Sequence, residues 1–325
     1  MAKNNDLNAA KAGKNDEFYT QLDDIAKEIV YYRPHFEGKK VLCNCNDALH
    51  TGFAKFFSLQ FEILELKELI CTTFSMEEGE HGVVYRYKGD KNGNRTPDIE
   101  EWEQTLMEGN GGFNTPEGLA LIDEADIVVT NPPFSLFREF ISIMMEHDKK
   151  FLIIGNVNAI TYKEEFPLIK ENKLWLGVSI TSGDRVFNVP DNYPLEAAGC
   201  GVDDNGKPFI RVKGVRWFTN LDHNKRHEEL ILYKKYNEEE FPKYDNYDAI
   251  NVDKVCDIPL DYEGIMGVPI TFMDKYCPDQ FEVLDARDYA LKEELKNKST
   301  YLIKDADGSI NGKAKYARIL IRFKK

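Results

Sequence analysis

The sequence of 325 residues lacks the features that mark membrane, secreted and zinc-stabilised proteins. It contains no apolar run of about 18 residues, the length that a membrane-spanning helix needs. Residues 1–15 are polar and carry lysines, unlike the apolar segment of a secretory signal peptide. The six cysteines are scattered, and Cys43 and Cys45 lack the two-residue gap that is usual in zinc sites. We therefore expect a cytoplasmic protein with reduced thiols and no membrane partner.

Metal ligands and positive charge are also scarce. His223 and His227 are spaced to share one helix face, but no cysteine pair accompanies them, so we expect no metal. The 42 Lys and Arg residues against 56 Asp and Glu residues give a net charge of −14, which by itself argues against binding to phosphates. Basic residues nevertheless gather at both ends, because residues 289–325 carry ten Lys and Arg against four acids and residues 1–15 contain Lys3, Lys11 and Lys14.

The most informative stretch that is present is a β-branched apolar run that ends in Asn-Pro-Pro-Phe. Residues 127–130 have the composition of a buried parallel strand, and the two prolines that follow lack the N–H groups needed to extend it. Asn131, Pro132, Pro133 and Phe134 are therefore expected to form a loop at the carboxyl end of a strand, the edge at which open α/β sheets bind ligands. By average residue usage, such a tetrapeptide occurs by chance in only about 1% of chains of this length.

The chemistry of this loop suits an aromatic amine, whose lone pair is delocalised into its ring. The side-chain oxygen of Asn131 and the carbonyl of Pro132 can each accept one N–H of the amine and aim its lone pair at a methyl donor. Neither a general base nor a metal is then needed. The prolines stiffen the loop, and Phe134 offers a stacking face for a base that has been flipped out of a duplex.

Several further segments, together with this tetrapeptide, resemble the EcoRI-type adenine-specific DNA methyltransferases. The resemblance covers nearly the whole chain except roughly residues 75–112, and its most similar segments are residues 16–21, 126–139, 149–162, 243–251, 257–262 and 266–272. It implies transfer of a methyl group from S-adenosylmethionine to adenine N6 in double-stranded DNA, within a restriction-modification system. If specificity follows the resemblance, the target is GAATTC.

The resemblance also implies which residues form the site. The catalytic residues are Asn131, Pro132, Pro133 and Phe134. The cofactor contacts are a segment that closes over the cofactor, the turn after the first strand, and the catalytic asparagine: Phe18, Tyr19, Thr20, Cys43, Asn44, Asn46, Asp47 and Asn131. The DNA contacts are instead expected from charge and position: Lys11 and Lys14 belong to the basic head, Phe134 offers its ring, and Arg138 follows the catalytic loop by about one helical turn. A solvent-exposed or core-edge role for Arg138 is equally open.

The chain departs from the usual methyltransferase pattern at the cofactor site. The turn after the first strand lacks the glycines that most methyltransferases have there, and Cys, Asn and Asp stand in their place, a degenerate form that the resembled family itself shares. The second strand does not end in an acid, and residues 109–113 lack the acid that the family usually shows before phenylalanine. The sequence therefore identifies no residue for the ribose or the adenine of the cofactor.

Strand and helix patterns alternate, which predicts an α/β protein with a doubly wound, mostly parallel sheet. The resemblance implies that this is the S-adenosylmethionine-dependent methyltransferase fold. The expected strands are 39–46, 69–74, 127–130, 151–155, 174–178, 215–219 and 316–323, and the expected helices are 24–32, 53–66, 136–145 and 163–171. We expect an insertion at about 75–112 that contains a small hairpin, and a linker or surface excursion at 237–248. The expected divisions are a flexible basic head (1–15), a catalytic domain (16–232) and a C-terminal region for DNA target recognition (233–325).

Two other functions remain open on the sequence. Enzymes that methylate RNA or protein glutamine use the same tetrapeptide for the same amine chemistry. The missing glycines and acid also suit a DNA-binding protein that has lost its cofactor. The oligomeric state is open, with a monomer favoured.

Overall fold

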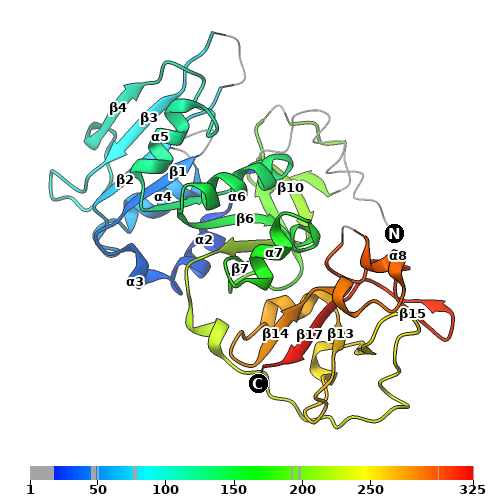
Figure 1. Cartoon of the computed structure of the whole chain (residues 1–325). Helices are drawn as coiled ribbons and strands as arrows, with labels where there is room; N and C mark the ends of the chain where they lie inside the picture. The colour runs from blue at the N-terminus through cyan, green and yellow to red at the C-terminus, as the bar shows by residue number, and fades with distance from the viewer. Residues whose placement is uncertain are drawn as a thin grey trace. The chain divides into compact units, whose positions relative to one another are not determined.

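The computed structural model describes residues 18–44, 49, 51–75, 79–191, 193–196, 199–298 and 300–324, and it divides into two compact units (Figure 1). The first unit contains the described residues up to Val157 together with Gly177–Leu221, and the second contains Asn158–Leu176 and the residues from Asp222 onward. The chain therefore passes between the units after Val157, Leu176 and Leu221. The predicted functional division after residue 232 stays a prediction. The expected basic head lies outside the described residues.

The first unit is built on a large mixed sheet whose strands in this unit have the order β4-β3-β2-β1-β5-β6-β11. β1 pairs in parallel with β2 and β5, and β5 pairs in parallel with β6. β3 is antiparallel to β2, and β11 is antiparallel to β6. These strands are β1 (Lys40–Asn44), β2 (Glu68–Thr72), β3 (Val83–Tyr87), β4 (Trp102–Leu106), β5 (Ile127–Thr130), β6 (Lys150–Asn156) and β11 (Val215–Thr219), whereas the residues of β7 (Trp175–Leu176) belong to the second unit. The parallel centre therefore brings the carboxyl ends of β1, β2, β5 and β6 to one edge.

Helices cover both faces of this sheet, and its central strands are therefore buried on both sides. One face forms a core with α2 (Leu22–Ile29) and α4 (Gly52–Leu59). On the other face, Phe137 of α6 (Phe137–Glu146) packs at 5.0 Å between ring centroids against Phe218 of β11. α5 (Pro116–Glu124) begins where the Thr115 hydroxyl accepts a hydrogen bond from Gly118 N, the expected N-cap arrangement.

Several predicted boundaries differ from the structure. The predicted helix 24–32 ends at Ile29, and Pro34 lies in a separate short helix, α3 (Arg33–Phe36), where a first-turn N–H would have no partner anyway. The predicted helix 53–66 ends at Leu59. The hairpin expected in residues 75–112 is confirmed as β3 and β4, which extend the main sheet beyond β2.

A small antiparallel sheet with the order β8-β10-β9 completes the first unit. Its strands are β8 (Asp184–Asn188), β9 (Cys200–Val202) and β10 (Pro208–Lys213). Phe187, Ile210 and Val212 from this sheet are buried in the same core as α2 and α4. The small sheet is therefore fixed to the body of the unit.

The second unit contains a four-stranded sheet with the order β12-β13-β17-β14. Its strands are β12 (Ile250–Asn251), β13 (Met266–Val268), β14 (Phe281–Leu284) and β17 (Ile319–Phe323), beside a β15–β16 pair (Ser309–Ile310, Lys313–Ala314) and the helices α7 (Glu165–Lys170) and α8 (Glu293–Lys296). The interpretation of residues 237–248 as a linker or surface excursion is wrong. Phe241, Tyr244 and Tyr247 are buried, and the Tyr244 hydroxyl donates to Asn251 Oδ1 at 2.8 Å. The tyrosine hydroxyl groups made the segment look polar in the sequence, although its aromatic rings belong to the core.

Short 3₁₀ segments connect these elements: η1 (Ile99–Glu101), η2 (Phe134–Leu136), η3 (Val157–Thr161), η4 (Asn224–His227), η5 (Val255–Asp257), η6 (Ile270–Lys275) and η7 (Ala286–Tyr289). Within the described part of the chain, none of the helices has both the length and the apolar character needed to cross a membrane.

Candidate active site

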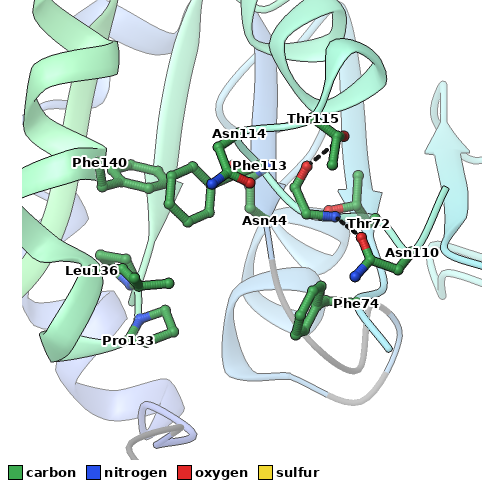
Figure 2. Close-up of a pocket in the computed structure, with 13 residues that line it drawn as sticks. Asn44, Thr72, Phe74, Asn110, Phe113, Asn114, Thr115, Pro133, Leu136 and Phe140 are labelled. Carbon is green, nitrogen blue, oxygen red and sulfur yellow. Dashed lines mark hydrogen bonds between the residues drawn. The ribbon is translucent and has the colours of Figure 1, made fainter. Parts of the chain in front are cut away.

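A cavity of about 370 Å³ lies in the first unit at the edge where the parallel strands end (Figure 2). Its volume falls in the range of small-molecule sites, which span about 300–1,000 Å³. Its walls come from the ends of β1 and β2, from the loop before α5, and from the catalytic loop and the helix after it: Asn44, Thr72, Phe74, Asn110, Gly111, Gly112, Phe113, Asn114, Thr115, Pro132, Pro133, Leu136 and Phe140. The predicted edge is therefore where the structure has a pocket.

The walls of the cavity are uncharged and partly aromatic. Figure 2 shows Phe74 and Asn110 on one side and Pro133, Leu136 and Phe140 on the other. None of the residues that line it carries a formal charge. Flat apolar walls with a few amide and hydroxyl groups suit a neutral heteroaromatic ring better than a phosphate.

One wall of the cavity is a loop whose backbone is held by an acid of α5. Glu117 accepts hydrogen bonds from Glu108 N at 2.9 Å and Gly109 N at 2.8 Å. These two backbone donors, Glu108 first, hold the pKa of the Glu117 carboxyl below its usual range. Asn110 Oδ1 also accepts from Gly112 N at 3.2 Å. The loop therefore has a defined path around the cavity although it contains three glycines.

The predicted catalytic loop follows β5 as expected, and Asn131 occupies a defined orientation. Its Nδ2 donates to the Phe18 carbonyl oxygen at 2.6 Å. A carbonyl oxygen accepts but does not donate, so the amide nitrogen must be the end that faces it. The Oδ1 atom is buried and has no hydrogen-bond partner among the described residues. Just before it, the Thr130 hydroxyl donates to Asn44 O at 2.6 Å and ties the end of β5 to the end of β1.

The other residues of the tetrapeptide divide between the cavity and the protein interior. Pro132 and Pro133 line the cavity, whereas Asn131 and Phe134 do not. Phe134 begins η2, is half-buried and meets the Phe18 ring edge-on, with centroids 5.7 Å apart. The two prolines of the tetrapeptide therefore form part of the cavity rim, and the Phe134 ring packs against the Phe18 ring.

The structure brings the predicted cofactor segment Phe18, Tyr19 and Thr20 to this loop, although more than a hundred residues separate them in sequence. The Thr20 carbonyl passes so close to Gly52, at the start of α4, that a Cβ there would lie 2.4 Å from it. Thr20 Oγ1 and Asn44 Oδ1, like Asn131 Oδ1, are buried without a hydrogen-bond partner among the described residues. Buried oxygens are rarely left unsatisfied, so these three indicate where a ligand supplies donors.

Other predicted residues are placed differently or lie outside the described residues. The Cys43 side chain is fully buried in the core with α2 and α4, so any cofactor contact of Cys43 would come from its backbone. Arg138 is exposed at the second position of α6. Asn46, Asp47, Lys11 and Lys14 lie outside the described residues. All of these assignments stay predictions.

Sequence reasoning predicted Asn44, Pro132 and Pro133 as site residues and missed the other ten residues of the wall. Four of these are Thr72, Phe74, Leu136 and Phe140. The first two follow from the end of the second strand, which reaches the same edge as the catalytic loop. Leu136 and Phe140 come from the segment directly after that loop, where apolar residues look like ordinary helix core. Phe113, which closes the loop that lacks the family's acid, does line the cavity, and its ring packs 4.9 Å from that of Phe140.

Comparison with known proteins agrees with this geometry. Residues 6–324 match the family described as adenine-specific methyltransferase EcoRI. The chain is 46% identical over 334 residues to the Type II methyltransferase M.EcoRI of Escherichia coli, covering 100% of this chain and 98% of that protein. It is 39% identical to M.MpnI of Mycoplasma pneumoniae, covering 97% of each, and 38% identical to M.MgeORF184P of Mycoplasma genitalium, covering 97% of this chain and 98% of that protein. No solved structure matches the chain.

A sheet with a cavity at its carboxyl edge and an Asn-Pro-Pro-Phe loop on the rim defines an amino-methyltransferase site. The match covers almost the whole chain, and the chain belongs to the EcoRI family of adenine-specific methyltransferases.

Proposed function

We propose that this chain transfers a methyl group from S-adenosylmethionine to adenine N6 in double-stranded DNA, as the modification enzyme of a restriction-modification system. The observation that carries the proposal is the fixed amide of Asn131, which directly precedes Pro132 on the cavity wall and whose buried Oδ1 has no hydrogen-bond partner among the described residues. The Type II methyltransferases to which the chain is similar support DNA as the substrate.

The residues around the cavity fit the cofactor. Asn44 lines the cavity, and its buried Oδ1 has no hydrogen-bond donor within the described part of the chain. Gly111 has φ +84, and a Cβ there would lie 2.0 Å from the Thr73 carbonyl, so only glycine permits this wall. Phe74 and Phe113 would flank the cofactor's adenine, and Asn44 and Thr20 would accept hydrogen bonds from its polar groups. When bound, S-adenosylmethionine supplies a methyl group on a positively charged sulfur.

The chain's own residues prepare the amine. Asn131 Oδ1 and the Pro132 carbonyl would each accept one N–H of adenine N6, which turns the nitrogen lone pair out of the ring system. The prolines keep both acceptors in place before substrate binds. Phe134 would stack on the adenine, which must leave the duplex to reach this loop.

The second unit is the proposed reader of the DNA sequence, with GAATTC as the proposed target because of the similarity to M.EcoRI. Part of its basic tail is already paired within the unit. Arg318 NH2 lies 3.0 Å from Asp253, Arg322 NH2 lies 2.6 Å from Glu282, and the Lys298 ammonium lies 2.6 Å from Asp307. The exposed Lys304 and Lys313 are therefore better phosphate contacts than these residues. We also propose that the first unit has the doubly wound methyltransferase fold and that residues 75–112 are an insertion in it.

Methyl-group tracing tests the proposal. The purified chain is incubated with S-adenosylmethionine labelled in the methyl group and, separately, with duplex DNA, RNA and protein. We expect label in DNA and N6-methyladenine after digestion to nucleosides. Label only in RNA or in protein glutamine would identify one of the other amine methyltransferases. Absence of label, together with no calorimetric heat from S-adenosylmethionine at millimolar concentration, would indicate a DNA-binding protein without cofactor.

A further inference from the structure

The short segment that carries the Phe18 carbonyl is fastened to the last residue of β8. Tyr19 and Asn188 exchange backbone hydrogen bonds, Tyr19 N to Asn188 O at 2.9 Å and Asn188 N to Tyr19 O at 3.1 Å. The Gln21 side chain adds a third bond, from Nε2 to Asn188 Oδ1 at 2.9 Å. Gln21 and Asn188 are half-buried, so these bonds are only partly exposed to competition from water. The position of the segment is therefore set by the small sheet.

Aromatic packing fixes the same segment a second time. Phe18 is 5% exposed, and its ring lies between Phe187 of β8 and Phe134 of the catalytic loop, with 5.7 Å between centroids on each side. The contact with Phe134 is edge-on at 82°, a favoured aromatic geometry. β8 thus holds both the backbone and the ring of the residue that touches the catalytic loop.

The catalytic loop depends on this segment through one hydrogen bond. The Phe18 carbonyl accepts from Asn131 Nδ2 at 2.6 Å, and Asn131 Oδ1 is thereby turned the other way, where no described residue bonds it. An amide can rotate to exchange its oxygen and nitrogen, and only one of the two arrangements presents an acceptor to the substrate. The Phe18 carbonyl selects that arrangement. It also requires an N–H at position 131, because a carboxylate there would place an acceptor against an acceptor.

We propose that Asn188 is a positioning residue for methyl transfer, which acts with Gln21 by holding the Phe18 carbonyl that orients the Asn131 amide. This inference rests on the proposed function. It gives the Phe18–Thr20 segment a role in the chemical step in addition to the predicted contact with the cofactor.

Three variants of the small sheet test the role of Asn188. Asn188→Leu removes the acceptor for Gln21 and keeps the number and branching of the side-chain heavy atoms, and Asn188→Asp keeps the acceptor. Asp203→Ala is the matched control, because Asp203 Oδ1 accepts from Asn205 N at 2.9 Å and Lys207 N at 2.8 Å in the β9–β10 turn and has no bond to the Phe18 segment. We expect single-turnover methyl transfer by Asn188→Leu to be about tenfold slower at saturating cofactor, since small misplacements of a reacting group are costly. Asn188→Asp and Asp203→Ala should stay near the wild-type rate, and DNA affinity should be unchanged in all three variants.

The orientation itself is tested by a pH profile of Asn131→Asp. The protonated carboxyl can donate to the Phe18 carbonyl as the amide does, whereas the carboxylate cannot. The rate of Asn131→Asp divided by that of the wild type should therefore rise as the pH is lowered from about 8 to about 6, the range into which burial moves a carboxyl pKa. The wild-type amide does not titrate, so the ratio cancels effects from elsewhere.

Three results would overturn the inference. A rate of Asn188→Leu that recovers fully at saturating cofactor would assign the segment to cofactor binding alone. An equal loss in Asp203→Ala would assign the effect to stability of the small sheet. A flat pH ratio for Asn131→Asp would remove the orientation argument. If the wild type itself methylates no DNA, RNA or protein, the proposed function fails instead, and the two failures are thereby told apart.

Discussion

The side chain of Asn131 has two polar ends in different surroundings. The nitrogen is bonded to a backbone carbonyl, and the oxygen is buried without a partner among the described residues. Leaving a buried oxygen unsatisfied costs about 1–3 kcal/mol. We interpret the unsatisfied oxygen as a preorganised acceptor, because it is already in place before the substrate amine supplies N–H donors.

Replacing Asn131 should therefore affect chemistry and not DNA affinity. We expect Asn131→Ala to slow single-turnover methyl transfer by at least about 100-fold, as removal of one preorganised polar contact typically does. The dissociation constant for duplex DNA, measured with the same preparation, should change little. A single-turnover rate near that of the wild type would exclude Asn131 from the mechanism.

Phe134 is tested through base flipping. If its ring stacks on the extruded adenine, it contributes about 1–3 kcal/mol, the range found for base–aromatic stacking. Phe134→Ala should then lower both the methylation rate and the flipped population, which 2-aminopurine at the target position reports by its fluorescence. Phe134→Tyr keeps a stacking face and should behave nearly as the wild type.

The edge-on contact with Phe18 gives Phe134 a structural role as well, so fluorescence must be interpreted together with rate. Stacking on the protein ring can itself quench part of the 2-aminopurine signal. If Phe134→Ala matches the wild type in both measurements, Phe134 only braces the Phe18 ring, and another residue holds the base.

At the scale of elements, charged side chains join β3 to the parallel centre of the sheet. Glu124 of α5 accepts from the Lys40 ammonium at 2.7 Å and from the Arg86 guanidinium at 2.7 Å, and Arg86 also reaches Glu68 at 3.1 Å. The hydrogen bond from Arg86, followed by that from Lys40, lowers the pKa of Glu124 to about 2. The network lies at the amino end of β1, where Lys40 pairs with Glu68, and therefore away from the cavity.

This network predicts an acid-dependent loss of stability. The folded pKa of Glu124, about 2, lies below the ordinary glutamate pKa of 4.5, so its contribution to stability is complete above about pH 4.5 and is lost as the pH falls toward 2. Urea unfolding at a series of pH values should show a smaller loss between these limits for Glu124→Gln than for the wild type. Glu100→Gln, an exposed acid outside the network, is the control. Identical pH curves for Glu124→Gln and the wild type would contradict the predicted linkage.

Elements whose own residues determine their structure were predictable from the sequence. The lining of the cavity, which several separate elements contribute to, was not. The strand 127–130 and its tetrapeptide were predicted at the right positions because β-branched residues and two prolines determine local structure. Phe74 and Phe140 carry no such signal, since an aromatic in a strand end or helix is usually core. The segment 237–248 was misinterpreted because tyrosines and acids read as polar until their rings are seen to be buried.

At the scale of the whole molecule, the net charge of −14 conflicts with a DNA substrate unless basic residues are grouped. Several tail residues are paired with acids within the second unit, which leaves fewer free cations there than the sequence suggested. The contribution of the basic head, whose residues 1–14 lie outside the described part of the chain, is thereby more important to test.

Removal of residues 1–14 should weaken DNA binding at low salt and flatten its dependence on salt. Each phosphate contact that is lost lowers the slope of log K against log salt by roughly 1, and the head offers Lys3, Lys11 and Lys14. Sequence preference should stay the same, because phosphate contacts carry no base information. The triple change Lys3→Gln, Lys11→Gln and Lys14→Gln should reproduce the effect. An unchanged slope in both variants would show that the head contacts no phosphate.

Family membership was predictable from the sequence because similar segments run along nearly the whole chain. The division into two units was not, since Asn158–Leu176 joins the second unit while Gly177–Leu221 returns to the first. A chain that passes from one unit to the other and back shows no change in residue composition at these points. The residues that read the DNA sequence are likewise set by contacts that a linear pattern does not contain.

The central claim is tested most directly by the DNA of cells that express the chain and have no adenine methylation of their own. Nucleoside mass spectrometry should detect N6-methyladenine with the wild type and none with a folded Asn131→Ala variant, and methylation-sensitive sequencing should place the modified base in a single sequence context, with GAATTC as the proposed one. DNA without N6-methyladenine, or equal amounts with both proteins, would contradict the account.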